Sequence, residues 1–307
     1  MLEAAASLGY QPDANAQNLR WGKSKVVGVL VPDMKNPHYW QILTGIEREA
    51  HRSGYTLLVF HSALVKSEED VGLRELARRR IDGLILISSF PPSWGESTRS
   101  LTDSRMPVVD LSNVDSPFDR VVANYRDGTR QVMDHLLALG HRRIGFIYGV
   151  ASPEVGLDRL LPYREALAAR DLSAGDDLVV TCGTTMEDGY GAAERLLSLP
   201  RRPSAIIAIN DLLAIAVARA ANDRGLAIPR DLSLVGFDDI PFARFFLPSL
   251  TTVRRETEHV GERALRLLLE RMANPLLPQR VEEVGSQLVP RESTGPAPEQ
   301  CTAPVKT

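Results

Sequence analysis

Short runs of valine, isoleucine and leucine recur along the chain, separated by stretches with helical periodicity. Near-continuous apolar runs are typical of parallel strands that helices cover on both faces. The alternation therefore predicts a doubly wound α/β fold. The expected strands cover residues 26–31, 55–60, 83–88, 107–111, 120–123, 144–148, 177–181, 204–209 and 233–236.

Capping residues mark several of the helices between these strands. Asn36 and Pro37 suit the N-cap and first turn of a helix over 38–53. Gly140 is suited to end a helix over 126–139 in the left-handed conformation. Further helices are expected over 68–80, 158–170, 186–198, 211–224 and 255–272.

The number of strands exceeds what one sheet in this chain would comfortably hold, so we predict two doubly wound parallel-sheet lobes. The helix over 255–272 is expected to return to the first lobe. Because Pro, Thr, Ser, Gly and Gln dominate the C-terminus, it is expected to be a flexible tail. The predicted boundaries are 25–142 with 254–275 for the first lobe, 143–253 with 276–292 for the second, and 293–307 for the tail.

Composition limits the setting of the protein. No apolar run approaches the ~20 residues that span a bilayer, and the N-terminus lacks a secretory signal. Cys182 and Cys301 are too few for a disulfide network, which fits a reducing compartment. The net charge of −3 gives no global attraction to nucleic acid, so any DNA contact must be local. We expect a cytoplasmic protein without a membrane partner.

Short polar side chains follow most of the predicted strands. Ligands of open α/β sheets bind beyond the carboxyl ends of the strands, where Asp33, Ser88, Asn113, Asn210 and Asp238 fall. Two such edges facing each other would form a cleft with donors and acceptors on both walls. This pattern indicates a site for a small polyhydroxylated ligand such as a sugar.

Some of these residues also have a structural explanation. Asp239 precedes Ile240-Pro241 and is better explained as a helix cap than as a ligand contact. Asn210 is equally suited to cap the helix over 211–224. Tyr39, on the first turn of its helix, is better explained by half-buried packing than by a ligand contact.

Motifs for catalysis or metal binding are missing from the sequence. We find no phosphate-binding glycine loop, no Gly-x-Ser-x-Gly elbow and no metal-ligand spacing among the six histidines. Cys182 is better explained as a buried free thiol than as a nucleophile. We therefore predict neither a cofactor nor an enzyme.

Several motifs occur in an order that resembles one family of regulators. The resemblance, to the LacI/GalR (lactose-repressor) family, covers about residues 2–295. It implies a core with the type I periplasmic-binding-protein-like fold, a small-molecule effector and a homodimer. The motifs are Asn36-Pro37, Gly45-Ile46-Glu47, Ile81-Asp82-Gly83-Leu84-Ile85, Leu139-Gly140-His141-Arg142-Arg143, Asn210-Asp211, Val235-Gly236-Phe237-Asp238-Asp239, Pro248-Ser249-Leu250-Thr251-Thr252 and Arg291-Glu292-Ser293-Thr294.

The resemblance also assigns roles to single residues. It places effector contacts on Arg159, Asn210 and Asp238, and an aromatic ring that stacks on the ligand on Tyr39. Two departures, Asn124-Tyr125 in place of Asp-Asn and Pro162 in place of glycine, leave the identity of the ligand open. The complete predicted effector site consists of Asp33, Tyr39, Ser88, Asn113, Tyr125, Arg159, Asn210 and Asp238.

Residues 11–24 resemble the family's hinge helix and linker. A helix from Asp13 to Arg20 has only about two turns, so it needs a docking partner such as DNA to order it. The family's hinge inserts a leucine between base pairs in the minor groove of an operator, and this role falls on Leu19. The alternative is that Leu19 packs into the first lobe. The predicted DNA-binding residues are Asn15, Ala16, Leu19, Arg20 and Lys23.

Residues 1–10 correspond to a remnant of the family's DNA-binding headpiece. The chain begins about where the third headpiece helix would stand, so the helix-turn-helix that reads bases is expected upstream of Met1. The favoured function is a ligand-responsive transcriptional repressor. The alternatives are a periplasmic-type sugar-binding protein and a stand-alone sugar-sensing domain. The first would need a signal or lipoprotein segment and would have no reason to carry residues 15–23.

Overall fold

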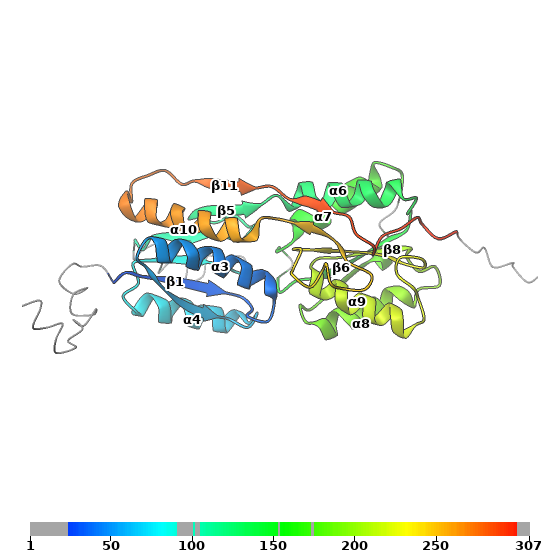
Figure 1. The fold of residues 1–307 in the computed structure, drawn as a ribbon, viewed down its shortest axis with the longest axis horizontal. Coiled ribbons are helices and arrows are strands. Elements are labelled where there is room, and N and C mark those ends of the chain that lie inside the picture. The colour runs from blue at the N-terminus through cyan, green and yellow to red at the C-terminus, as the bar shows by residue number, and fades with distance from the viewer. Residues whose placement is uncertain (1–23, 91–100, 102–104, 153, 173–174, 300–307) are drawn as a thin grey trace, which may run out of the picture.

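The computed structural model describes residues 24–90, 101, 105–152, 154–172 and 175–299. They form two lobes that lie end to end, each with a six-stranded sheet between helices (Figure 1). The predicted α/β fold class is confirmed. The segment from 1 to 23, with the predicted headpiece remnant and hinge residues, lies outside the described residues.

The first lobe contains an all-parallel sheet in the order β11-β5-β4-β3-β1-β2. Helices α3 and α10 cover one face and α4 covers the other, each over its own apolar cluster. The strands are β1 (Val26–Val31), β2 (Thr56–His61), β3 (Gly83–Leu86), β4 (Val108–Asp110), β5 (Asp119–Ala123) and β11 (Val281–Val284), and the helices are α3 (Pro37–Arg52), α4 (Lys66–Arg78) and α10 (Thr257–Ala273).

The second lobe has the order β12-β10-β9-β8-β6-β7, in which only β12 is antiparallel to its neighbour. Its helices surround one large apolar core. The strands are β6 (Ile144–Gly149), β7 (Val179–Cys182), β8 (Ala205–Ala208), β9 (Ser233–Phe237), β10 (Thr251–Arg254) and β12 (Gln287–Val289), and the helices are α6 (Tyr125–Ala138), α7 (Leu157–Ala168), η1 (Asp176–Leu178), α8 (Met186–Leu197) and α9 (Asp211–Asp223).

The return of α10 to the first lobe, as predicted, depends on a close helix–helix contact. A Cβ on Gly45 of α3 would lie 1.9 Å from the carbonyl oxygen of Glu258, and one on Gly261 of α10 would lie 2.2 Å from that of Ile42. Only glycine permits this approach, because any side chain at either position would collide with backbone.

The predicted lobe boundaries were wrong at two places. The chain crosses at Asn124 and not near residue 142, because the apolar face of α6 packs into the second core through Val132, Met133 and Leu136. Residues 276–284 belong to the first lobe, because β11 pairs with β5. Periodicity shows that a helix or strand has a buried face, but it does not show which sheet that face meets.

The start of the predicted tail at residue 293 was also wrong. Ser293 is fully buried, accepts a hydrogen bond from the Thr251 amide at 2.8 Å and donates one to the Leu234 carbonyl at 2.6 Å. Further along, the Ala297 amide donates to the Leu139 carbonyl at 2.8 Å. Polar groups of this segment therefore form hydrogen bonds with the second lobe instead of a flexible tail.

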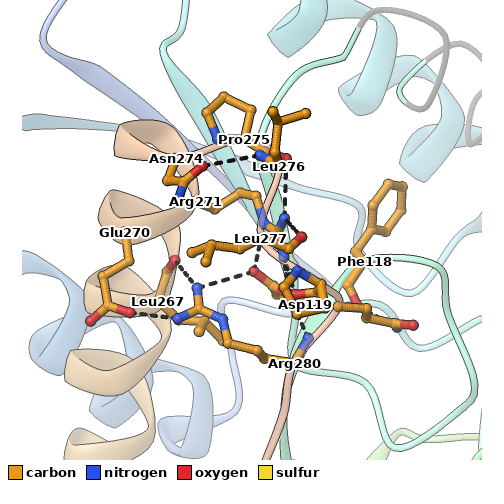
Figure 2. A network of polar contacts seen from close by, with 12 residues as sticks. Phe118, Asp119, Leu267, Glu270, Arg271, Asn274, Pro275, Leu276, Leu277 and Arg280 are labelled. Carbon is orange, nitrogen blue, oxygen red and sulfur yellow. Dashed lines mark hydrogen bonds and ion pairs between the residues drawn. The ribbon is translucent and has the colours of Figure 1, made fainter.

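A buried carboxylate fastens the segment after α10 to β5 (Figure 2). The side chain of Asp119 accepts two hydrogen bonds from Arg271, at 2.9 and 2.7 Å, and one from the Arg280 amide at 2.8 Å. Arg271 also donates to the Pro275 and Pro278 carbonyls, at 3.2 and 2.8 Å. One carboxylate thus holds α10, the following turn and β11 together.

Removal of the Asp119 carboxylate should destabilise the first lobe. Asp119→Ala leaves Arg271 without its partner, which should cost about 3–5 kcal/mol of unfolding free energy in urea denaturation. Burial alone would raise the pKa of Asp119, but hydrogen bonds and charges from Arg271 and Arg280 hold it below its usual value. The stabilisation should therefore be present at neutral pH and fade below about pH 4, where the carboxyl group becomes protonated.

A matched control is available in Asp134, whose exposed side chain pairs with Arg170 at 3.1 Å. Asp134→Ala should change stability far less, because solvent screens this pair. Equal losses in the two variants would contradict a special role for the Asp119 network.

Candidate functional site

A pocket lies where the carboxyl ends of the two sheets face each other, and it encloses about 140 Å³. Side chains from both lobes line it. All of the predicted effector-site residues are among them: Asp33, Tyr39, Ser88 and Asn113 from the first lobe, and Tyr125, Arg159, Asn210 and Asp238 from the second.

Arg159, on the first turns of α7, is the central cation of the second-lobe wall. Its guanidinium carbon lies 4.1 Å from the centroid of the Tyr125 ring and 5.9 Å from that of Phe237. Asp158 supplies a carboxylate oxygen 3.5 Å from Nε. The stacked rings fix the plane of the guanidinium group, so its donors are oriented before a ligand arrives.

Asp238 follows β9 and is almost completely buried beside this cation. Its backbone has a φ of 102°, a conformation that non-glycine residues rarely adopt, and its amide donates to the Val253 carbonyl at 2.9 Å. Burial raises the pKa of Asp238, although the charges of Arg255 and Arg159 oppose this shift. Strain and a buried charge at one residue are typical of a functional position.

The sequence analysis did not identify His38 and Arg255, which also line the pocket. His38 Nδ1 lies 3.4 Å from Asp238 Oδ1, so it connects the first lobe to the second. Its Nε2 contacts the Arg255 guanidinium. Burial, and then the charges of Arg255 and Arg159, hold the pKa of His38 well below its usual value. The position of His38 beside Tyr39 was the only signal that could have pointed to it.

Three predicted site residues already use their polar atoms within the protein. Asn210 caps α9, as its alternative explanation predicted, by accepting a hydrogen bond from the Leu213 amide at 2.9 Å. Ser88 donates to Glu69 at 2.7 Å, and burial raises the pKa of Glu69 to about 7. Asn113 donates to the Asp158 carboxylate across the lobe boundary at 2.7 Å. These residues shape the pocket, and any ligand must use their remaining donors and acceptors.

Two further expectations concern Asp239 and Cys182. Asp239 is not a helix cap, because its carboxylate pairs with Arg254 at 2.6 Å and Arg291 at 2.5 Å, and only turns follow it. Cys182 is a half-buried free thiol. Burial raises its pKa to about 11, which leaves little nucleophilic thiolate at neutral pH.

Within the described residues, no group of His, Cys, Asp and Glu side chains could hold a metal ion. In the same part of the chain, no helix is long and apolar enough to cross a membrane.

These features define a two-lobed ligand-binding core with a polar pocket between its lobes. Residues 133–294 match the family model described as a periplasmic binding protein-like domain. The transcriptional repressor PurR of Pectobacterium carotovorum is 31% identical over 297 residues, which cover 96% of this chain and 87% of that repressor.

Solved structures show the same relationship. A ribose-bound LacI-family regulator from Enterococcus faecium superposes with a TM-score of 0.79 and 26% identity, covering 88% of this chain and 99% of that one. A complex of the regulator CelR with cellobiose has a TM-score of 0.80 and 26% identity, covering 95% of this chain and 88% of that one. The chain belongs to the LacI/GalR family of transcriptional regulators, and its PurR relatives are transcriptional repressors and not enzymes.

The buried His38 should make folding sensitive to pH. Because His38 stays neutral in the folded protein and protonates below about pH 6.5 when unfolded, wild-type stability should fall as pH decreases. Between about pH 7.5 and 5.5 this histidine alone should account for about 1.4 kcal/mol of lost unfolding free energy. Urea denaturation of wild type and His38→Gln at both pH values measures this, and an identical pH dependence would contradict a neutral His38.

Proposed function

We propose that this chain is a cytoplasmic, homodimeric, DNA-binding repressor whose core closes on a small polar effector, namely a sugar or a related polyol or nucleoside. The pocket between the lobes carries the proposal. The Asp238 carboxylate can accept hydrogen bonds from ligand hydroxyl groups, and the oriented Arg159 guanidinium group can donate to them. The Tyr39 and Tyr125 rings can cover an apolar face of the ligand.

Contacts across the lobe boundary support a response to the effector. His38 and Asp238 lie 3.4 Å apart across the boundary, and Asn113 and Asp158 lie 2.7 Å apart. A ligand that binds between these pairs has different contacts in open and closed arrangements. It can therefore shift the equilibrium between them, and by linkage the affinity for operator DNA shifts as well. The ribose and cellobiose held by the two related regulators make sugars the first ligands to test.

Loss of either central charge should weaken effector binding. A calorimetric screen of sugars, polyols, nucleosides and nucleobases first identifies the ligand. Arg159→Ala and Asp238→Asn should then each weaken binding at least about tenfold, because each removes a charge-assisted hydrogen bond worth about 1.5–3 kcal/mol.

Arg219→Ala is the matched control, since Arg219 lies on the exposed face of α9 and pairs only with Asp223 among the described residues. Its affinity should equal that of the wild type. A ligand bound equally well by all three variants would place the effector elsewhere, and chemical turnover of the ligand would indicate an enzyme.

The hinge assignment predicts a separate effect on DNA. Leu19→Ala should weaken binding to a duplex selected from a random library by at least about tenfold, because the wedge that offsets the cost of unstacking bases is lost. Fluorescence anisotropy measures this affinity, with Met186→Ala in the second lobe as an exposed apolar control. Unchanged DNA affinity with a destabilised core would support the alternative, in which Leu19 packs into the first lobe.

A further inference from the structure

Arg255 lies on the connection that leads from β10 in the second lobe to α10 in the first. Its side chain lines the pocket, and the residue is only 9% exposed. In the part of the chain that the structure describes, no carboxylate oxygen lies within 4.0 Å of its guanidinium group, and its Nε has no hydrogen-bond partner. A buried guanidinium thus faces the pocket without a close counter-ion.

Neighbouring arginines differ from Arg255 because each has a carboxylate close to its guanidinium group. Arg254, the preceding residue, pairs with the Asp239 carboxylate at 2.6 Å. Arg159, across the pocket wall, has the Asp158 carboxylate 3.5 Å from its Nε. Arg255 instead contacts the neutral His38 ring and lies 5.2 Å from the centroid of the Tyr125 ring. Asp238 acts on Arg255 through its charge, but it lies beyond the 4.0 Å of an ion pair. Because a buried charge without a direct partner is costly, an anion that paired with Arg255 in the pocket would be stabilised.

The two pocket arginines converge on one aromatic ring. The guanidinium carbons of Arg159 and Arg255 lie 4.1 and 5.2 Å from the Tyr125 centroid. Two planar guanidinium groups near one ring form a site for an acceptor with several oxygens, such as a carboxylate or a phosphate. Asp238 and the Asn210 amide remain on the same wall for hydroxyl groups.

We infer that the effector is an anionic polyhydroxylated molecule, a sugar acid or a sugar phosphate, whose anionic group is bound by Arg255 together with Arg159. This inference rests on the proposed function and narrows its ligand class. A neutral sugar would leave Arg255 without a directly paired counter-ion, whereas a carboxylate or phosphate would pair with it within the pocket.

Matched ligand pairs test the inference on the wild-type chain by calorimetry. Glucose is compared with glucuronate, galactose with galacturonate, and ribose with ribose 5-phosphate. The anionic member of at least one pair should bind at least about tenfold more tightly than its neutral partner. The first two pairs detect a carboxylate and the third a phosphate. Binding of the anion should weaken as the salt concentration rises, more than binding of the neutral member does.

Arg255→Gln removes the charge but keeps a planar amide donor. It should lower affinity for the anionic ligand at least about tenfold and for its neutral partner less than about threefold. Arg254→Gln, at the adjacent residue that pairs with Asp239 outside the pocket, should leave both affinities unchanged. The comparison on the wild-type chain decides the question even if Arg255→Gln does not fold.

Equal or tighter binding of every neutral member would overturn the inference while leaving the proposed function intact. Equal losses in the Arg254→Gln and Arg255→Gln variants would overturn it as well, since the effect would then not depend on a charge in the pocket. Failure of the wild-type chain to bind any ligand of the pairs or of the wider screen would contradict both the inference and the proposed function.

Discussion

The site depends on one geometric constraint: all parallel strands of a sheet end at the same edge. In this protein two such edges face each other, so loops that are far apart in sequence meet at one pocket. Within the described residues the chain crosses between the lobes at Asn124, Arg255 and Gly285. The first two crossings adjoin or contain pocket residues, Tyr125 and Arg255, so the pocket and the connections between the lobes share residues.

Buried charged and polar groups give the pocket its chemical character. Asp238 and His38 come from different lobes, and Arg159 and Arg255 lie close enough for their charges to affect both. Placing such groups in a low-dielectric interior is costly, and replacing them by apolar residues of similar size would often leave the fold at least as stable. The strained backbone at Asp238 adds to this cost. Because both features lie at the pocket, we propose that ligand binding accounts for them.

The fold could be predicted well from sequence where each element has a strong local signal. The buried runs at β1, β6 and β8 and the capped helices α3 and α6 lie within a few residues of their predicted positions. The strands β10, β11 and β12 were missed, because their sequences TTVR, VEEV and QLV lack a continuous apolar run. For the site, the rule about strand ends and the family motifs together identified residues that all line the pocket.

The sequence by itself determined most of the secondary structure, the fold class and the edges at which polar groups gather, because these follow from local patterns of burial and from parallel-strand geometry. Only the tertiary structure decided that α6 packs into the second lobe and that β11 joins the sheet of the first. The sequence of an element does not indicate which sheet it packs against or joins. The tertiary structure also placed His38 and Arg255 in the pocket and gave Arg159 its ring and carboxylate partners. Except for Asp158, which directly precedes Arg159, these partners are distant in sequence, and their contacts set which charges remain without a direct partner for a ligand.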